Sequence, residues 1–108
     1  MPKSVFVGEF EQLVLLALLR LGDEGYALLL RERLDEIAGR AVSRGALYRT
    51  LERLEQKGFV TWTVEPGTEL RGGHARRRYE VSAPAVAALR ASRNALLELW
   101  DGLEEALK

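Results

Sequence analysis

The side chains with the clearest chemical potential are basic and lie in the middle of the chain. Between Arg40 and Arg78, nine Lys or Arg residues stand against four acids, an excess of five positive charges in a chain whose total charge is zero. An arginine donates two hydrogen bonds to a guanine edge, and any cation attracts phosphate. This stretch is therefore expected to bind a polyanion, unless its charges only keep a basic hairpin solvated.

A helical repeat organises the basic residues between positions 43 and 58. Leu47, Leu51 and Leu54 recur at helical spacing and are expected to face the core. Successive residues of an α-helix turn by about 100°, so a polar set falls on the opposite face. This set is Gly45, Arg49, Glu52 and Gln56, with Tyr48 and Arg53 beside it and Arg44 nearer its boundary. Ser43 is a typical N-cap, and such a helix start leaves backbone N–H groups available to a phosphate.

A second basic cluster lies in a predicted β-hairpin. Residues 59–64 are rich in β-branched and aromatic side chains, and residues 76–81 alternate between two faces. Two glycine-containing pairs favour a loop between these strands. The cations are expected to reach phosphates or the minor groove, the alternative being an edge strand protected by charge. They are Arg71, His74, Arg76, Arg77 and Arg78.

Three helices are predicted before the hairpin and one after it. Apolar spacing predicts helices over residues 9–21 and 26–38, each followed by a glycine, and a third between Ser43 and Gly58. The four residues between the second and third helices give the spacing of a helix-turn-helix motif. A last helix of about six turns is predicted from Val86 to Leu107. The predicted fold class is mainly α with a small β-hairpin (α+β).

Composition argues against several classes of function. The chain has no Cys, and its one histidine, His74, lies in a basic loop without an evident nucleophile beside it. No catalysis, metal or cofactor is therefore expected. The apolar run over residues 13–19 is too short to cross a bilayer, and the features of a signal peptide are missing, so a soluble cytoplasmic protein is expected.

The last predicted helix carries an apolar seam that a small domain cannot cover by itself. Spacings of seven, four, three and four residues approximate a heptad pattern. An exposed seam of this kind calls for a second subunit, although the helix would instead be covered if it folded back on the first helix. The predicted homodimer interface is Leu89, Leu96, Leu99, Trp100, Leu103 and Leu107, with the first helix contributing. A tryptophan in such a seam is most often a packing residue, but Trp100 and Leu96 are also candidates to line an effector pocket for a planar hydrophobic small molecule.

Four stretches of the sequence together resemble a known family. They are residues 8–19 (GEFEQLVLLALL), Gly25-Tyr26, residues 43–58 (SRGALYRTLERLEQKG), and the hairpin with Gly72-Gly73 and RRRY at 76–79. This pattern closely resembles the PadR-like transcriptional regulators, and its most specific part is Ser-x-Gly-x-Leu-Tyr-x-x-Leu-x-x-Leu. Unlike many relatives, the chain has a single helix after the hairpin, and Ser82-Ala83-Pro84 stands where others have Thr-Pro.

The resemblance implies a winged helix-turn-helix DNA-binding domain over residues 1–82 and a C-terminal dimerisation helix over 83–108, within one compact unit. It places Ser43, Arg44, Gly45, Tyr48 and Arg49 at the DNA, and Arg76 to Arg78 on the wing. The function implied is a dimeric transcriptional repressor that binds a two-fold operator in double-stranded DNA and that a small aromatic effector releases. The alternative is a protein-interaction module that uses the same scaffold without binding DNA.

Overall fold

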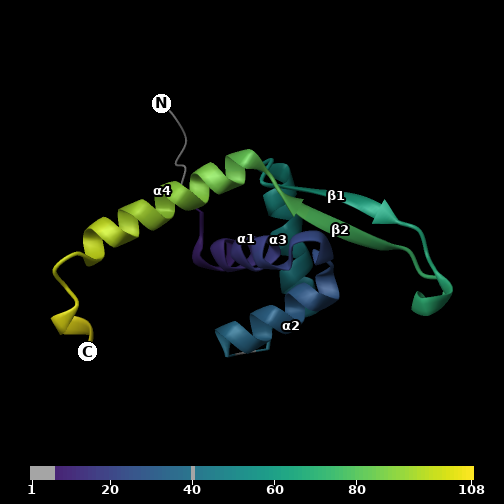
Figure 1. Ribbon diagram of the computed structural model, residues 1–108, viewed down its shortest axis with the longest axis horizontal. Coiled ribbons are helices and arrows are strands. Elements are labelled where there is room, and N and C mark those ends of the chain that lie inside the picture. The colour runs from purple at the N-terminus through teal and green to yellow at the C-terminus, as the bar shows by residue number, and fades with distance from the viewer. Residues whose placement is uncertain (1–6, 40) are drawn as a thin grey trace.

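The computed structural model of the protein describes residues 7–39 and 41–108. Over these residues the chain forms four α-helices and one antiparallel hairpin, so the predicted fold class is confirmed. The order is α1 (Glu9–Leu21), α2 (Ala27–Ala38), α3 (Arg44–Gln56), β1 (Val60–Glu65), β2 (Arg76–Val81) and α4 (Ala83–Trp100) (Figure 1). Three short 3-10 turns are η1 (Gly22–Glu24), η2 (Glu69–Arg71) and η3 (Glu105–Leu107).

The core lies where the first three helices meet the base of the hairpin. Each element contributes apolar side chains at its own period, three or four residues in the helices and two in the strands. The largest fully buried side chains are Val14, Leu15, Leu30, Leu34, Leu47, Thr50, Leu51, Leu54 and Val60. Burying this set fixes the helix-turn-helix and leaves the opposite face of α3 in solvent.

The turn between α2 and α3 is closed by hydrogen bonds that fix the angle of the two helices. Gly39 ends α2 in the left-handed conformation, with φ +67°. Asp35 Oδ1 then accepts a hydrogen bond from the backbone N–H of Val42 at 2.7 Å. Ser43 is the N-cap of α3, as predicted, and its hydroxyl accepts from the Ala46 N–H at 3.1 Å.

The segment between α1 and α2 joins the hairpin through a single isolated bridge. The register of the hairpin pairs Trp62 with Tyr79, and Tyr26 forms an isolated antiparallel bridge with Arg78. The Tyr79 N–H also donates to the Gly25 carbonyl at 2.8 Å. A Cβ on Gly25 would lie 2.3 Å from the Tyr79 carbonyl oxygen, so only glycine fits this approach. The segment therefore holds Tyr26 against the outer part of β2.

Helix α4 ends at Trp100, so the prediction of a continuous helix to Leu107 is wrong. Asp101 leaves the helical conformation and Gly102 has φ +82°, which turns the chain out of the helix axis. Leu103 and Leu107 consequently lie on a separate terminal turn rather than along one helical seam. Leu89, predicted for the dimer interface, is buried in the core of the protomer.

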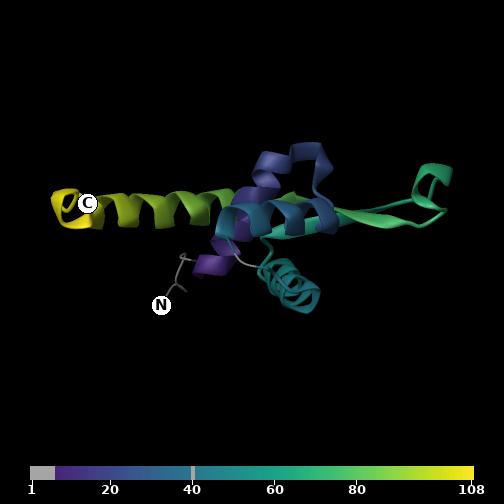
Figure 2. The same ribbon diagram turned by 90° about the horizontal axis from the view of Figure 1, so that it is seen from below.

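The second half of α4 extends away from the helical body. The helix and the hairpin project in opposite directions, while α3 stands to one side of them (Figures 1 and 2). The radius of gyration is 16.0 Å, compared with about 13 Å for a compact domain of this length. The excess reflects these two projections.

Candidate nucleic-acid interface

The exposed face of α3 carries the residues that the sequence assigned to DNA. Because the leucines on the opposite side are buried, the N-cap and four residues of the first two turns are exposed to solvent. They are Ser43, Arg44, Gly45, Tyr48 and Arg49. Helix geometry therefore brings this predicted set together on one open surface.

Arg49 and Arg44 lie along this surface. Arg49 Nη1 is 3.2 Å from the position that a Cβ would occupy on Gly45, so its guanidinium lies directly over the glycine. The Arg44 guanidinium carbon is 5.8 Å from the centre of the Tyr48 ring. The missing side chain at residue 45 thus provides room for an arginine, a role that the sequence alone did not indicate.

Arg53 differs from Arg49, although both are exposed on α3. Its Nη2 donates a hydrogen bond to Thr50 Oγ1 at 3.0 Å. Its positive charge also helps to lower the pKa of Glu11 in α1. The structure therefore places Arg53 beside the N-terminal part of α1, with an intramolecular partner for its guanidinium.

The three consecutive arginines of β2 point to two different faces of the hairpin. Because side chains alternate along a strand, Arg77 shares a face with Trp62, while Arg76 and Arg78 share the other. The Arg77 guanidinium carbon is 4.0 Å from the centre of the Trp62 ring, and the Trp62 indole N–H donates to Glu55 of α3. Arg77 is thereby held beside the exposed face of α3.

On the other face of the hairpin, donors converge on the Glu65 carboxylate. The Tyr26 hydroxyl donates to Oε1 at 2.8 Å, Arg76 Nε lies 3.4 Å from Oε1, and Arg78 Nε lies 3.3 Å from Oε2. The Arg76 guanidinium also stacks on the Tyr26 ring, 3.5 Å from its centre. Arg78 has further acidic neighbours, Glu80 at 2.9 Å and Asp23 at 3.9 Å.

The ionisation of this cluster follows from its contacts. The Tyr26 hydrogen bond, with the hydrogen bond and charge of Arg76 and the charge of Arg78, lowers the pKa of Glu65 against the opposing effect of burial. The same hydrogen bond to Glu65 raises the pKa of the Tyr26 hydroxyl. Glu65 is therefore a carboxylate and Tyr26 a neutral donor at neutral pH.

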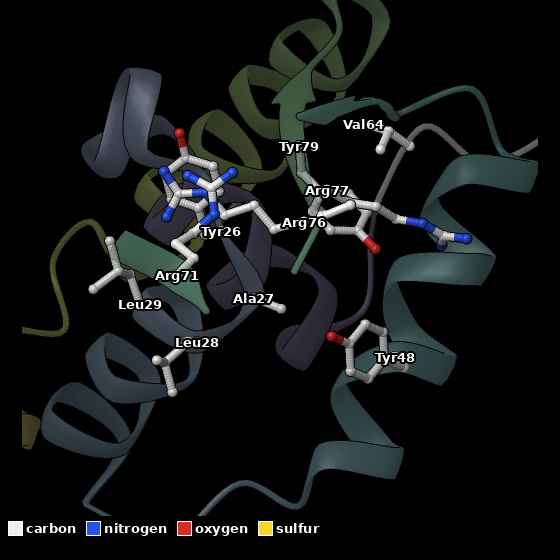
Figure 3. A pocket seen from close by; sticks show the side chains of 11 residues that line it. Tyr26, Ala27, Leu28, Leu29, Tyr48, Val64, Arg71, Arg76, Arg77 and Tyr79 are labelled. Carbon is white, nitrogen blue, oxygen red and sulfur yellow. The ribbon is translucent and has the colours of Figure 1, made fainter. Parts of the chain in front are cut away.

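An open groove of about 810 Å³ separates the hairpin from α2 and α3. Figure 3 shows Tyr26, Arg71 and Arg76 together on one side of it, and Tyr48 and Arg77 on the other. Leu28 and Val64 add apolar surface. The groove thus has aromatic and apolar walls with a cationic rim, which suits the sugar-phosphate backbone of a nucleic acid.

The hairpin loop holds the two remaining predicted residues. Arg71 organises the loop, since its guanidinium donates to the carbonyls of Pro66 and His74. The loop lies at the end of the hairpin that is farthest from α4 (Figure 1). Arg71 lines the groove, whereas His74 is exposed and is not among the residues that line it.

The sequence alone did not identify Glu65, Tyr26 or Trp62 as parts of this surface. By sequence pattern, Glu65 is only an acid that reduces the local charge, and Tyr26 is only an apolar helix residue. Their roles depend on contacts between segments that are far apart in sequence, such as the hydrogen bond between Tyr26 and Glu65, whose positions differ by 39. The Gly25-Tyr26 pair was visible only as part of the family resemblance.

A helix-turn-helix followed by a β-hairpin wing defines the class of winged-helix proteins. The sequence pattern of the transcriptional regulator PadR-like family matches residues 15–90. The chain belongs to this family, whose members are transcriptional regulators that bind DNA.

Two solved structures that carry the same family name have a similar fold. A PadR-like transcription factor of Bacteroides fragilis superimposes with a TM-score of 0.71 at 23% identity, covering 90% of this chain and 88% of its own. A PadR family transcriptional regulator of Eggerthella lenta has a TM-score of 0.67 at 26% identity, covering 93% and 87%. A search among curated proteins found no match. None of the helices among the described residues has the length and apolar character needed to cross a membrane.

Proposed function

We propose that this protein is a homodimeric repressor of transcription that recognises a two-fold operator in double-stranded DNA. The observation that carries the proposal is the open face of α3, on which Arg44, Tyr48 and Arg49 lie with Arg77 of the hairpin nearby. In winged-helix and helix-turn-helix proteins the second helix of the motif enters the major groove. The proposal assigns that position to α3.

The contacts divide into base recognition and backbone binding. Arg49 reads a guanine edge, with Arg44 and Tyr48 beside it, while Ser43 and the start of α3 face a phosphate. The residues proposed to bind the sugar-phosphate backbone from the wing are Arg71, His74, Arg76 and Arg77. Arg53 and Arg78 complete the proposed DNA-binding set. Like Arg71 and Arg76 they have intramolecular partners, and they are proposed to attract the phosphates through their positive charge.

The apolar surface at the end of the chain supports the proposed dimer. Six large apolar residues from position 96 onward are exposed on the projecting half of α4 and the turn after it. They are Leu96, Leu97, Leu99, Trp100, Leu103 and Leu107. Leu16 and Leu19 of α1 are about half exposed as well. A patch of this size is typical of a subunit interface rather than of a solvated surface.

The two proposed functions, DNA binding and dimerisation, are assigned to consecutive parts of the chain. Residues 1–82 bind DNA and residues 83–108 join two copies, with the first half of α4 packed on the DNA-binding unit. The two-fold symmetry of the dimer sets two α3 helices about one turn of DNA apart, and the operator is expected to be palindromic. Binding there prevents access of the transcription machinery.

A planar hydrophobic effector is proposed to bind beside Trp100 and Leu96 in the dimer. Such a ligand releases the operator only if it binds one spacing of the two α3 helices better than the other. A panel of planar aromatic compounds should quench or shift tryptophan emission. A Trp100→Phe variant separates this signal from that of Trp62, and an unchanged emission across the panel argues against an effector of this class.

Operator selection from random duplex DNA tests the proposed function as a whole. The expected result is enrichment of a palindrome whose half-sites lie about 10 base pairs apart, bound with an affinity that falls steeply as salt rises. Absence of enrichment even at low salt would contradict DNA binding. It would favour the protein-interaction module, in which the same surface binds an acidic partner.

A further inference from the structure

We infer that Glu65 is a positioning residue for DNA binding, because its carboxylate fastens the outer half of the wing to Tyr26 of the helical body. This inference rests on the proposed function. Glu65 is an acid within a cationic surface, and by its charge alone it should weaken the binding of a polyanion. As a positioning residue it strengthens that binding instead.

Glu65 stands at the point where the hairpin needs an external attachment. It is the last residue of β1 and pairs with Arg76, the first residue of β2, so the strands separate into the loop immediately beyond it. The inner half of the hairpin is held by Val60 and Tyr79 in the core, whereas Thr61, Thr63 and Val64 are exposed. Beyond Tyr79 the two strands bury no large side chain in the core, and a two-stranded ribbon of this kind is marginally stable by itself.

The carboxylate joins three segments at once. One oxygen receives the Tyr26 hydroxyl and Arg76, and the other receives Arg78. Glu65 is about two-thirds buried, with 32% of its side chain exposed, so these contacts are less screened than those of a surface ion pair. Tyr26 belongs to the short segment that already pairs with β2, which makes this attachment continuous with the sheet.

The attachment helps to position Arg77, in addition to the stacking of Arg77 on Trp62. Arg77 occupies the opposite face of β2, directly between Arg76 and Arg78, and it points to the groove beside Tyr48 of α3. Holding its two neighbours on one face keeps Arg77 on the other, next to the recognition surface. Without the hydrogen bonds and ion pairs of Glu65, the end of the wing beyond the Tyr26–Arg78 bridge moves more freely, and ordering it again on DNA costs conformational entropy.

The inference is tested by whether removal of the Glu65 charge weakens or strengthens operator binding. Operator binding is measured against salt for the full-length protein with Glu65→Gln, and for Glu69→Gln as a matched control, since Glu69 is an exposed acid of the same hairpin. Positioning by Glu65 predicts about tenfold weaker binding for Glu65→Gln. It also predicts a shallower salt dependence, by about 0.9 in slope for each phosphate that the wing no longer binds. The control should bind as well as the wild type or more tightly.

A second variant keeps the test informative if Glu65→Gln folds poorly. Tyr26→Phe retains the ring under Arg76 and removes only the hydroxyl that donates to Glu65, and it should weaken binding in the same direction. Thermal unfolding and circular dichroism monitor the fold of each variant. Binding by both variants that is equal to or tighter than that of the wild type overturns the inference, whereas a wild type that binds no selected duplex overturns the proposed function itself.

Discussion

At the scale of single residues, Arg49 is the side chain that we propose to contribute most to sequence recognition. Its guanidinium lies on the open face of α3, over Gly45, where an edge of a base in the major groove would meet it. Arg49→Ala should weaken operator binding by about 1–3 kcal/mol and relax the preference at one position of each half-site. Titration of the selected operator and of its single-base variants measures both effects. An unchanged affinity would place the base-reading surface elsewhere.

A second prediction for a single residue concerns Gly45, where a substitution should raise the stability of the fold but disturb the recognition of bases. A Cβ at this position would press on the end of the Arg49 side chain, which must then move. Alanine also stabilises a helix by about 0.5–1 kcal/mol relative to glycine. Gly45→Ala should therefore unfold at a higher temperature and show an altered base preference. Ala46→Gly, the reverse change at the next residue, should lower stability while the base preference is retained.

At the scale of elements, an ion pair joins the beginning of α1 to the end of α3. Lys57 Nζ lies 2.9 Å from both carboxylate oxygens of Glu11, a residue that is only 8% exposed and that also accepts from the Gly8 N–H at 3.1 Å. Burial alone would raise the pKa of Glu11, but these hydrogen bonds and the charges of Lys57 and Arg53 outweigh it and hold the pKa below its ordinary value. The ion pair therefore fixes the C-terminal end of α3 to α1.

Lys57→Met should lower the free energy of unfolding by about 1–3 kcal/mol at neutral pH, because a largely buried carboxylate loses its charged partner. The pKa of Glu11 is lower in the folded than in the unfolded chain, so its contribution is complete above the unfolded value of about 4.5. It is lost as pH falls through the folded pKa, and the difference between wild type and variant should shrink there. Urea unfolding from pH 7 to pH 3 measures this difference. Glu9→Gln, at an exposed acid of the first turn of α1, is the control, and its free energy of unfolding should follow that of the wild type across this pH range.

At the scale of the whole molecule, the projecting end of α4 leaves large apolar side chains uncovered in the protomer. Leu99 is 73% exposed and Trp100 46%, at the end of a helix whose first half alone is buried in its own protomer. Covering such a surface with a second copy removes apolar area from water at about 25 cal/mol per Å². The same contact would link two recognition helices, so dimerisation and operator affinity are expected to change together.

Leu99→Glu should convert the dimer to a monomer without unfolding it, because the side chain is exposed in the protomer. Sedimentation equilibrium measures the assembly, and operator affinity should fall at least tenfold, since each monomer then holds one half-site by itself. Asn94→Asp, an exposed polar change earlier in α4, is the matched control and should remain dimeric. A wild-type protein that stays monomeric at high micromolar concentration would contradict the proposed interface.

The local features of this protein were determined by its sequence. Leucines at helical spacing, the N-cap Ser43 and glycines such as Gly39 predicted the first three helices, and β-branched and alternating residues predicted the hairpin. These signals act between residues that are close along the chain. The same periodicity predicted the exposed face of α3. It overestimated α4, where the apolar spacing continues through Gly102 although the helix ends at Trp100.

Only the tertiary structure decided which charges are paired and which face the groove. The alternation of residues 76–81 already separates Arg77 from Arg76 and Arg78, but the sequence does not show what each arginine contacts. In the structure Arg77 stacks on Trp62 beside α3, whereas Arg76 and Arg78 lie against Glu65. The contacts of Tyr26 with Glu65 and of Lys57 with Glu11 span 39 and 46 residues. Such pairings arise from the packing of whole elements against each other, which no short-range pattern encodes. Residues close in sequence therefore determine the helices, whereas the arrangement of the charged surface depends on contacts across the whole fold.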